Sequence, residues 1–118
     1  MLRKLIVLLV LLVGVAPTVS AQSSAPLPVE RCVNLGNMLE APNEGEWGLS
    51  VEEYYFQTIA DAGFDAVRIP TKWSGHADFE PPYTIDPNFF ARMDEVIGWA
   101  LDANLTVILN IHHYDELA

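Results

Sequence analysis

The chain is poor in basic residues. Its 118 residues include 6 Lys and Arg against 16 Asp and Glu, which gives a formal net charge of −10 at pH 7. The phosphates of nucleic acids and anionic membrane surfaces repel a chain this acidic. We therefore expect no nucleic-acid partner and favour a neutral or cationic one, such as a neutral polymer. Solubility outside the cell explains the acidity equally well.

Cysteine and phosphate-binding glycine motifs are also scarce. Cys32 is the only cysteine, so no disulfide can form within the chain. Because Cys32 lies in an apolar stretch, we expect an inert buried thiol. That stretch ends in Gly36-Asn37-Met38 rather than in G-x-G-x-x-G. This absence argues against a doubly wound dinucleotide-binding fold.

The first 21 residues have the three parts of a secretory signal peptide. A start with Arg3 and Lys4 precedes an apolar block over residues 5–16, and a small-residue cleavage site ends at Ala21. A membrane anchor is the alternative, but a span needs about 20 apolar residues. We therefore expect export to the periplasm or the extracellular space, with no membrane attachment after cleavage near Ala21.

The remaining sequence divides into a linker and one domain. Residues 22–28 are small, polar and rich in Pro, as in a leader segment. Residues 29–118 then alternate apolar strands with amphipathic helices. The predicted strands are 32–36, 65–69 (where Pro70 ends the hydrogen bonding) and 106–111, and the predicted helices follow Ser50 and Asp86.

Local signals define both helices. Ser50 and Glu53 predict a capping box, after which Val51, Tyr55, Ile59 and Ala62 recur at helical spacing up to a left-handed Gly63. Asp86 and Pro87 predict an N-cap and a first helical residue. Phe90, Met93, Ile97 and Leu101 follow as an apolar stripe, with Phe89, Val96 and Ala100 beside it, up to a left-handed stop at Asn104.

Apolar strands alternating with helices are typical of an α/β fold with parallel strands. The loops after the strands are long and chemically rich, whereas those after the helices are short. In a (β/α)8 TIM barrel the functional loops follow the carboxyl ends of the strands. We therefore predict a (β/α)8 barrel of which about the first three βα units are present.

Polar side chains gather where each predicted strand ends. Asn37 and Glu40 follow the first strand, Arg68 and Trp73 belong to the second, and Asn110, His112 and His113 end the third. Neighbouring parallel strands end at the same edge, so these residues should converge on one cleft. Alternation along the third strand directs Asn110 and His112 into the barrel mouth and leaves His113 at the rim.

Each charged candidate admits more than one role. A buried Arg68 requires a carboxylate partner, either in a structural ion pair or as an active-site group that Arg68 keeps ionised. His112 and His113 are open to a metal site with Asp115 or Glu116, to hydrogen bonds with a substrate or a catalytic acid, and to a structural role. Neighbouring strand residues face opposite ways, which disfavours chelation, and we expect no metal.

Three aromatic residues lie in the loops after the strands. Trp47, Trp73 and Tyr83 are not at helical spacing. Their faces could stack on flat, weakly polar rings of a ligand. Ordinary packing of the loops is an equally good explanation for each of them.

Three ordered motifs resemble glycoside hydrolase family 5, the cellulase family. They are RCVNLGNMLE (31–40), AGFDAVRIP (62–70) with Trp73-Ser74, and VILNIHHY (107–114). The resemblance runs from about Val29 to the last residue. It implies a (β/α)8 barrel that cleaves β-1,4-glucans or related mannans with retention of configuration and without a metal or organic cofactor. Cys32 departs from the pattern, since relatives commonly carry glycine there.

The resemblance also implies roles for individual residues. Arg68 matches the arginine that supports the nucleophile, and His112 matches a histidine that lines the catalytic subsite. Asn37, Glu40 and His113 match sugar-contacting positions. The acid/base and nucleophile glutamates follow the fourth and seventh strands of the family, so none of the residues here is expected to be catalytic.

The resemblance leaves several functions open. We expect the amino-terminal part of a secreted, monomeric endo-β-1,4-glucanase that is inactive on its own. A β-mannanase of the same family, a non-catalytic carbohydrate-binding product and a metal-dependent barrel hydrolase are the alternatives.

Overall fold

The computed structural model describes residues 29–113. The predicted signal peptide (1–21) and linker (22–28), as well as Asp115 and Glu116, lie outside these residues. Along the chain the elements are β1 (Cys32–Asn34), α1 (Glu53–Asp61), β2 (Ala66–Thr71), the short 3-10 helix η1 (Trp73–His76), α2 (Pro87–Asp102) and β3 (Thr106–Ile111). The predicted alternation of strands and helices is confirmed.

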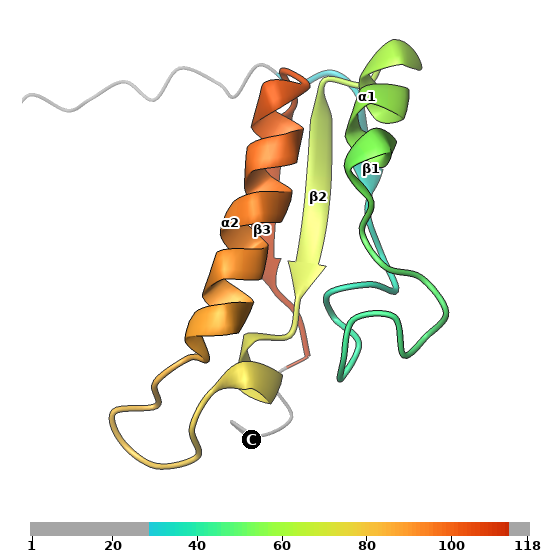
Figure 1. Ribbon diagram of the computed structural model, residues 1–118. Helices are drawn as coiled ribbons and strands as arrows, with labels where there is room; N and C mark the ends of the chain where they lie inside the picture. The colour runs from blue at the N-terminus through green and yellow to red at the C-terminus, as the bar shows by residue number, and fades with distance from the viewer. Residues whose placement is uncertain (1–28, 114–118) are drawn as a thin grey trace, which may run out of the picture.

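The three strands form one parallel sheet in the order β1-β2-β3. Helices α1 and α2 lie along the sheet, and all three strands run toward the same end of the molecule (Figure 1). This arrangement is that of the first units of a (β/α)8 barrel. Within residues 29–113 no helix is long and apolar enough to cross a membrane.

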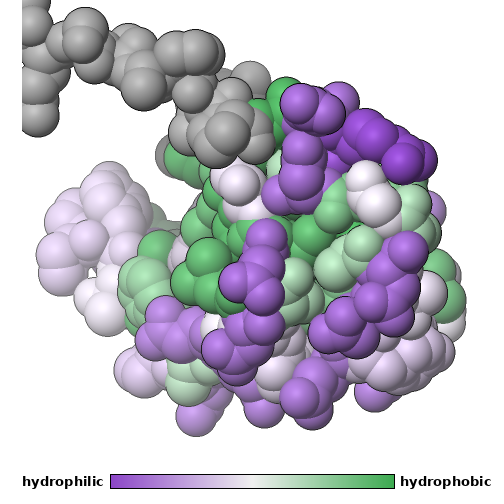
Figure 2. All heavy atoms as spheres, turned by 90° about the horizontal axis from the view of Figure 1, so that it is seen from above, coloured by the Kyte–Doolittle hydropathy of each residue, from purple (hydrophilic) through white to green (hydrophobic). Residues whose placement is uncertain are grey.

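The core lies between β2 and the two helices. Val67 and Ile69 of β2 are fully buried together with Phe56 of α1 and with Met93 and Val96 of α2. Burying each of these side chains stabilises the fold by about 1.5–3 kcal/mol. Figure 2, which looks along the strands from their amino-terminal ends, shows hydrophobic residues gathered inside a hydrophilic rim.

Both ends of α2 agree with their sequence signals. The Asp86 carboxylate accepts a hydrogen bond from the Asn88 amide at 2.8 Å, and Pro87 is the first helical residue. Asn104 adopts the expected left-handed conformation, with φ of 58°. Asp86 and Asn104 act through their immediate neighbours, which is why the sequence alone predicts them.

The buried face of α2 is rotated from the expected stripe. Phe89, Met93, Val96 and Ala100 are buried, whereas Phe90 and Leu101 are about half exposed (46% and 57%). Only Met93 of the predicted main stripe is fully in the core. Successive helical residues point about 100° apart, so both stripes satisfy the helical period, and packing against β2 selects one of them.

The capping box predicted for α1 is wrong. The helix begins at Glu53, and its N-cap residue Glu52 makes no side-chain capping hydrogen bond. The Val51 amide instead donates to the Glu44 carboxylate at 2.7 Å, a contact from outside the helix. At the other end, Gly63 has φ of 83° and ends the helix as expected.

Strand β2 continues past the predicted stop at Pro70. Pro70 and Thr71 pair with Asn110 and Ile111 of β3. The backbone groups of Arg68 and Pro70 face the same edge of β2, the edge next to β1. The Arg68 carbonyl accepts a hydrogen bond there from the Leu35 amide, just beyond β1, whereas Pro70 has no N–H to donate. Because β1 has ended at that level, no partner for the proline is lost.

Cys32 is exposed rather than buried, which corrects the expectation of a buried thiol. Val33 packs against the core, and alternation turns Cys32 and Asn34 to the opposite face of the sheet. That face of β1 is open within the described residues.

Candidate functional site

Three chain segments meet at the carboxyl edge of the sheet. The loop after β1, the loop after β2 and the residues after β3 all lie at the end toward which the strand arrows point (Figure 1). The Lys72 amide donates to the Leu39 carbonyl at 3.0 Å, and the His112 amide donates to the Thr71 carbonyl at 2.9 Å. The Ser74 hydroxyl donates to the His113 carbonyl at 3.2 Å. These hydrogen bonds connect the three segments to one another.

Glu40 organises the loop after β1. Its side chain is buried, with 5% exposed. One carboxylate oxygen accepts from the Asn37 amide at 2.6 Å and the other from the Met38 amide at 2.9 Å. Asn37 turns with φ of 65°. A carboxylate oxygen offers two acceptor directions, so each oxygen of Glu40 keeps capacity for a second donor.

Gly36 allows this loop to pass close to β1. A Cβ atom at this position would lie 2.7 Å from the Asn34 amide nitrogen and 3.3 Å from a Glu40 carboxylate oxygen. Any side chain would therefore displace Asn34 or Glu40. Gly36, the glycine of the first motif, therefore leaves room for the Asn34 and Glu40 side chains.

Glu40 and His113 line one cavity of about 240 Å³, as their predicted convergence requires. Pro42, Trp47 and Lys72 complete its lining. The rings of Trp47 and His113 meet edge to face with centroids 6.2 Å apart. The cavity thus combines a carboxylate, a cation, an imidazole and an aromatic face, which are groups that bind hydroxyl-rich ligands.

The two histidines that follow β3 do not form a chelating pair. Their rings meet at 69° with centroids 4.4 Å apart, and His113 has φ of 53°, which turns the chain. His112 is half-buried and His113 is exposed. Within residues 29–113 no three His, Cys, Asp or Glu side chains are grouped closely enough to hold a metal ion.

Arg68 differs from its expected surroundings in two ways. It is half-buried, and among the described residues the acceptor of its guanidinium is the Asn34 amide oxygen rather than a carboxylate. The register pairs Asn34 with Arg68 and Arg68 with Ile108. His112 lies four residues further along β3, or about 13 Å along the strand, so the backbone does not place it beside Arg68.

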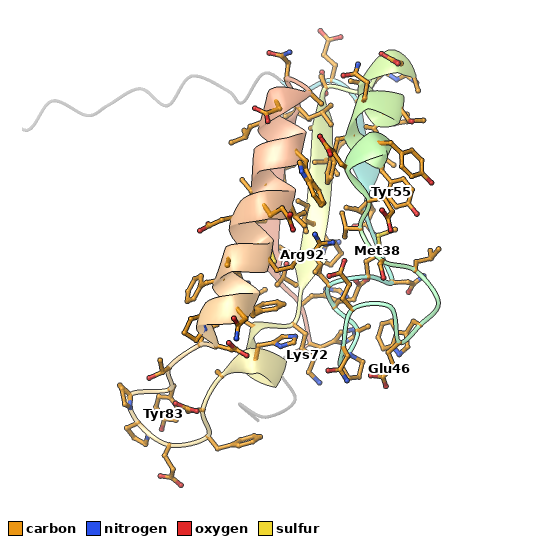
Figure 3. All side chains as sticks on the ribbon, in the orientation of Figure 1. Met38, Glu46, Tyr55, Lys72, Tyr83 and Arg92 are labelled. Carbon is orange, nitrogen blue, oxygen red and sulfur yellow. The ribbon has the colours of Figure 1, made fainter. Side chains whose placement is uncertain are left out.

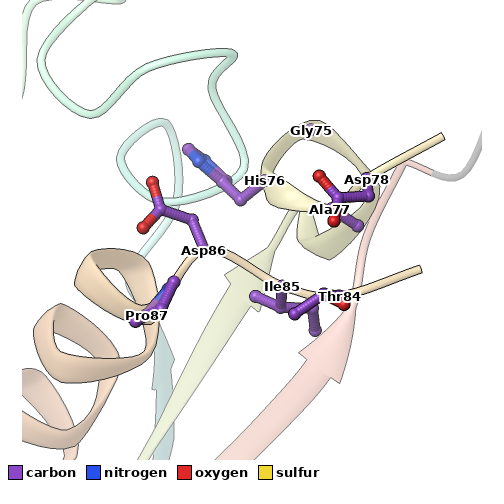
Figure 4. A pocket seen from close by; sticks show the side chains of 8 residues that line it. All are labelled: Gly75, His76, Ala77, Asp78, Thr84, Ile85, Asp86 and Pro87. Atoms are coloured by element: carbon purple, nitrogen blue, oxygen red, sulfur yellow. The ribbon is translucent and has the colours of Figure 1, made fainter. Parts of the chain in front are cut away.

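A second cavity of about 420 Å³ opens in the loop after β2 (Figure 4). Its lining includes His76, Asp78, Thr84 and Asp86. The His76 ring stacks on Phe89 at 3.7 Å and 9°. Burial lowers the pKa of His76 below its ordinary value, and the charge of Asp86 opposes this effect.

The predicted aromatic residues have different surroundings. Trp73 packs edge to face on Phe89 at 5.5 Å and against the core, which supports ordinary packing. Tyr83 is exposed at the far tip of the loop after β2 (Figure 3). Trp47 lines a cavity together with the predicted site residues Glu40 and His113.

Sequence reasoning missed three participants. Only a weak sequence signal points to Asn34. It lies on the same face of the first predicted strand as Cys32, and that strand is expected next to the strand of Arg68. Lys72 lies just beyond the second predicted strand and could have been included by position. The contact of Arg92 with Glu44 spans 48 residues and has no local signal.

Comparisons with known proteins agree with the motifs. The family model described as "Cellulase (glycosyl hydrolase family 5)" matches residues 30–118. Endoglucanase H of Acetivibrio thermocellus is 48% identical over 82 residues, which are 70% of this chain and 9% of that protein.

Solved structures are similar as well. Thermotoga maritima Cel5A, solved with cellobiose, aligns with a TM-score of 0.74 and 54% identity over 75% of this chain and 29% of its own. The same protein has been solved with mannotriose. A tri-modular Bacillus licheniformis endo-β-1,4-glucanase with cellotetraose aligns with a TM-score of 0.71 and 45% identity, over 75% of this chain and 18% of its own. The chain spans less than a third of each.

Proposed function

Because the chain belongs to glycosyl hydrolase family 5, we propose that it supplies the first βα units of a barrel that hydrolyses β-1,4-glucan with retention of configuration. The alignment with Cel5A bears out the predicted (β/α)8 fold class. The cavity lined by Glu40, Trp47 and His113 is the observation that supports this function most directly. A neutral polysaccharide also suits a chain with a net charge of −10.

In this proposal the chain binds and orients the substrate. Glu40 accepts hydrogen bonds from sugar hydroxyls with its remaining lone pairs, and His113 donates or accepts at the rim. Trp47 offers its ring to the apolar face of a sugar. Asn37 contacts the sugar next to Glu40.

Arg68 and His112 support the reaction rather than carry it. A guanidinium near the nucleophilic carboxylate stabilises the charged form and keeps its pKa low. His112 lines the subsite in which the bond is cleaved. The two glutamates of the retaining mechanism come from strands other than the three described here, and the reaction uses no metal or organic cofactor.

β-1,4-Mannan is a second candidate substrate. The supporting observation is the 54% identity to Thermotoga maritima Cel5A, which has been solved with cellobiose and with mannotriose. Glucose and mannose differ in the orientation of one hydroxyl, so polar side chains at the rim decide between them. A non-catalytic carbohydrate-binding role would use the same cavity without hydrolysis.

The test uses this chain continued at its carboxyl end by the part of Thermotoga maritima Cel5A that it does not match, which we call the continued chain. Release of reducing ends from mixed-linkage β-glucan and from β-mannan is measured with and without a chelator. We expect chelator-resistant hydrolysis of glucan. If neither polymer is hydrolysed, the non-catalytic carbohydrate-binding role is favoured. Activity that a chelator removes and zinc restores would support a metal hydrolase.

We also propose that the protein is exported and monomeric. The basic start, apolar block and small-residue site of residues 1–21 support export. Amino-terminal sequencing of the protein secreted by a bacterial host should begin at Gln22, and light scattering of the continued chain should give the mass of one copy. Retention of Met1 or a dimeric mass would contradict these statements.

A further inference from the structure

A bidentate ion pair connects the site loop to the outer helix. Arg92 of α2 donates from Nε and from one terminal nitrogen to the two carboxylate oxygens of Glu44, each at 2.9 Å. The same terminal nitrogen donates to the Val51 carbonyl at 2.7 Å, and the Val51 amide donates to Glu44 at 2.7 Å. Figure 3 shows Arg92 on the α2 side that faces the loop after β1. Glu44, Val51 and Arg92 therefore form a closed ring of hydrogen bonds.

The pair is sheltered from water. The Arg92 and Glu44 side chains are 26% and 21% exposed, and the guanidinium lies 5.0 Å from the centroid of the Trp99 ring. Burial raises the pKa of Glu44, but the hydrogen bonds from Arg92 and Val51 and the charge of Arg92 outweigh this and lower it. A partly buried, bidentate pair holds its geometry better than an exposed one.

Glu44 belongs to a short turn that also carries Trp47. The Glu46 amide donates to the Asn43 carbonyl at 3.0 Å, and the Gly48 amide donates to the Gly45 carbonyl at 2.9 Å. The Asn43 side chain donates to the Glu46 carboxylate at 2.8 Å. These bonds link residues 43–48 to one another, so an anchor at Glu44 also constrains the position of Trp47.

Trp47 needs such an anchor. About half of its surface is exposed (47%), and its ring meets His113 only at its edge, 6.2 Å between centroids. These contacts are too weak to fix an indole ring over the cavity that it shares with Glu40 and His113. The strong contacts of the turn are at Glu44.

We propose that Glu44 and Arg92 are positioning residues that hold Trp47 over the sugar-binding cavity, so that helix α2 sets the substrate affinity of the cleft from outside it. This inference rests on the proposed function, because Trp47 is given a sugar to stack on. Glu44 and Arg92 act only through Trp47 and touch no substrate themselves.

The test compares Glu44→Gln with Glu95→Gln in the continued chain. Glu95 is a matched control, since its exposed carboxylate also accepts a hydrogen bond from Arg92. For Glu44→Gln we expect KM for cellotetraose to rise about tenfold with kcat nearly unchanged, because ground-state and transition-state binding are lost together. For Glu95→Gln both parameters should stay within about twofold. Arg92→Lys, which keeps the charge and loses the bidentate geometry, should behave like Glu44→Gln.

A double-mutant cycle separates positioning from general damage to the fold. Once Trp47 is replaced by Ala, Glu44→Gln should raise KM no further. An equal rise with and without Trp47, an unchanged KM for Glu44→Gln, or an equal effect of Glu95→Gln would each overturn the proposal.

Failure of the proposed function is distinguishable from failure of this inference. If the continued chain hydrolyses nothing, the position of Trp47 is read by ¹⁹F NMR of fluorotryptophan-labelled protein, with the signal assigned by its loss in Trp47→Phe. We expect Glu44→Gln to shift this signal and Glu95→Gln to leave it in place. An unshifted signal in Glu44→Gln contradicts the positioning role whatever the activity.

Discussion

Arg68 is the residue whose surroundings differ most from those that its sequence context indicates. It donates to Asn34 across the face of the sheet that the helices do not cover. That face is the interior of a complete barrel. Asn34 thus holds the Arg68 guanidinium on the face that a complete barrel would enclose.

Arg68→Lys in the continued chain should lower kcat on β-glucan about 100-fold with a smaller change in KM. A lysine keeps the charge but loses the planar fork that contacts both Asn34 and a carboxylate. Initial-rate kinetics check this. Arg31→Lys is the matched control, because Arg31 is exposed and its guanidinium lies over the Phe64 ring at 4.8 Å. Equal kinetics for the two variants would show that Arg68 is only structural.

At the scale of elements, signals that act through neighbouring residues predict structure well, and tertiary contacts explain the errors. Asp86 marks the start of α2 through a local hydrogen bond, and Asn104 marks its end through local backbone geometry. The capping box at Ser50 fails because the helix begins only at Glu53, with Glu52 as its N-cap, and the Val51 amide before it donates to Glu44 from outside the helix. The convergence of Glu40 and His113 follows from the parallel arrangement of the strands. The distance from Arg68 to His112 depends in addition on the register between β2 and β3, which the amino-acid sequence alone does not determine.

The start of α2 also carries a pH-dependent contact. Burial lowers the pKa of His76 below 6.5, and Asp86 opposes the shift. The folded protein therefore favours the neutral ring, and protons bind more readily to the unfolded chain. Stability from His76 is fully present above pH 6.5 and falls as pH decreases through the folded pKa.

Urea unfolding of the continued chain at pH 7.5 and pH 5 measures this effect. We expect the unmodified protein to lose more stability on acidification than His76→Phe, which keeps a ring on Phe89 but cannot bind a proton. The carboxyl groups with lowered pKa, Glu44 and Asp65, have ordinary values of 4.5 and 3.8, so their contribution is lost mainly below this window. The same loss in both proteins would rule out His76 as the source.

At the scale of the whole molecule, the sheet has open edges within residues 29–113. Strand β3 pairs with β2 on one side only, and Leu109 and Ile111 are 40% and 65% exposed. Unpaired, apolar strand edges promote association between chains. The described part of the chain thus has a core on the helix side and an incomplete barrel interior on the other.

The purified 118-residue chain should therefore associate and be inactive on β-glucan. Size-exclusion chromatography with light scattering and a reducing-end assay measure both properties. Ile111→Lys should reduce association, because a charge on the exposed edge disfavours strand pairing, and it should not restore hydrolysis. A monodisperse chain that hydrolyses glucan would mean that the three strands suffice.

Kinetics of cellotetraose hydrolysis by the continued chain test most directly whether the cavity of Glu40, Trp47 and His113 binds β-1,4-glucan. Glu40→Gln removes an acceptor that holds the Asn37 and Met38 amides, and His113→Ala removes the rim imidazole. We predict that each variant lowers kcat/KM about tenfold or more, while Glu53→Gln, which changes an exposed carboxylate in the first turn of α1, has little effect. Equal kcat/KM for all three variants and the unmodified protein would contradict the account.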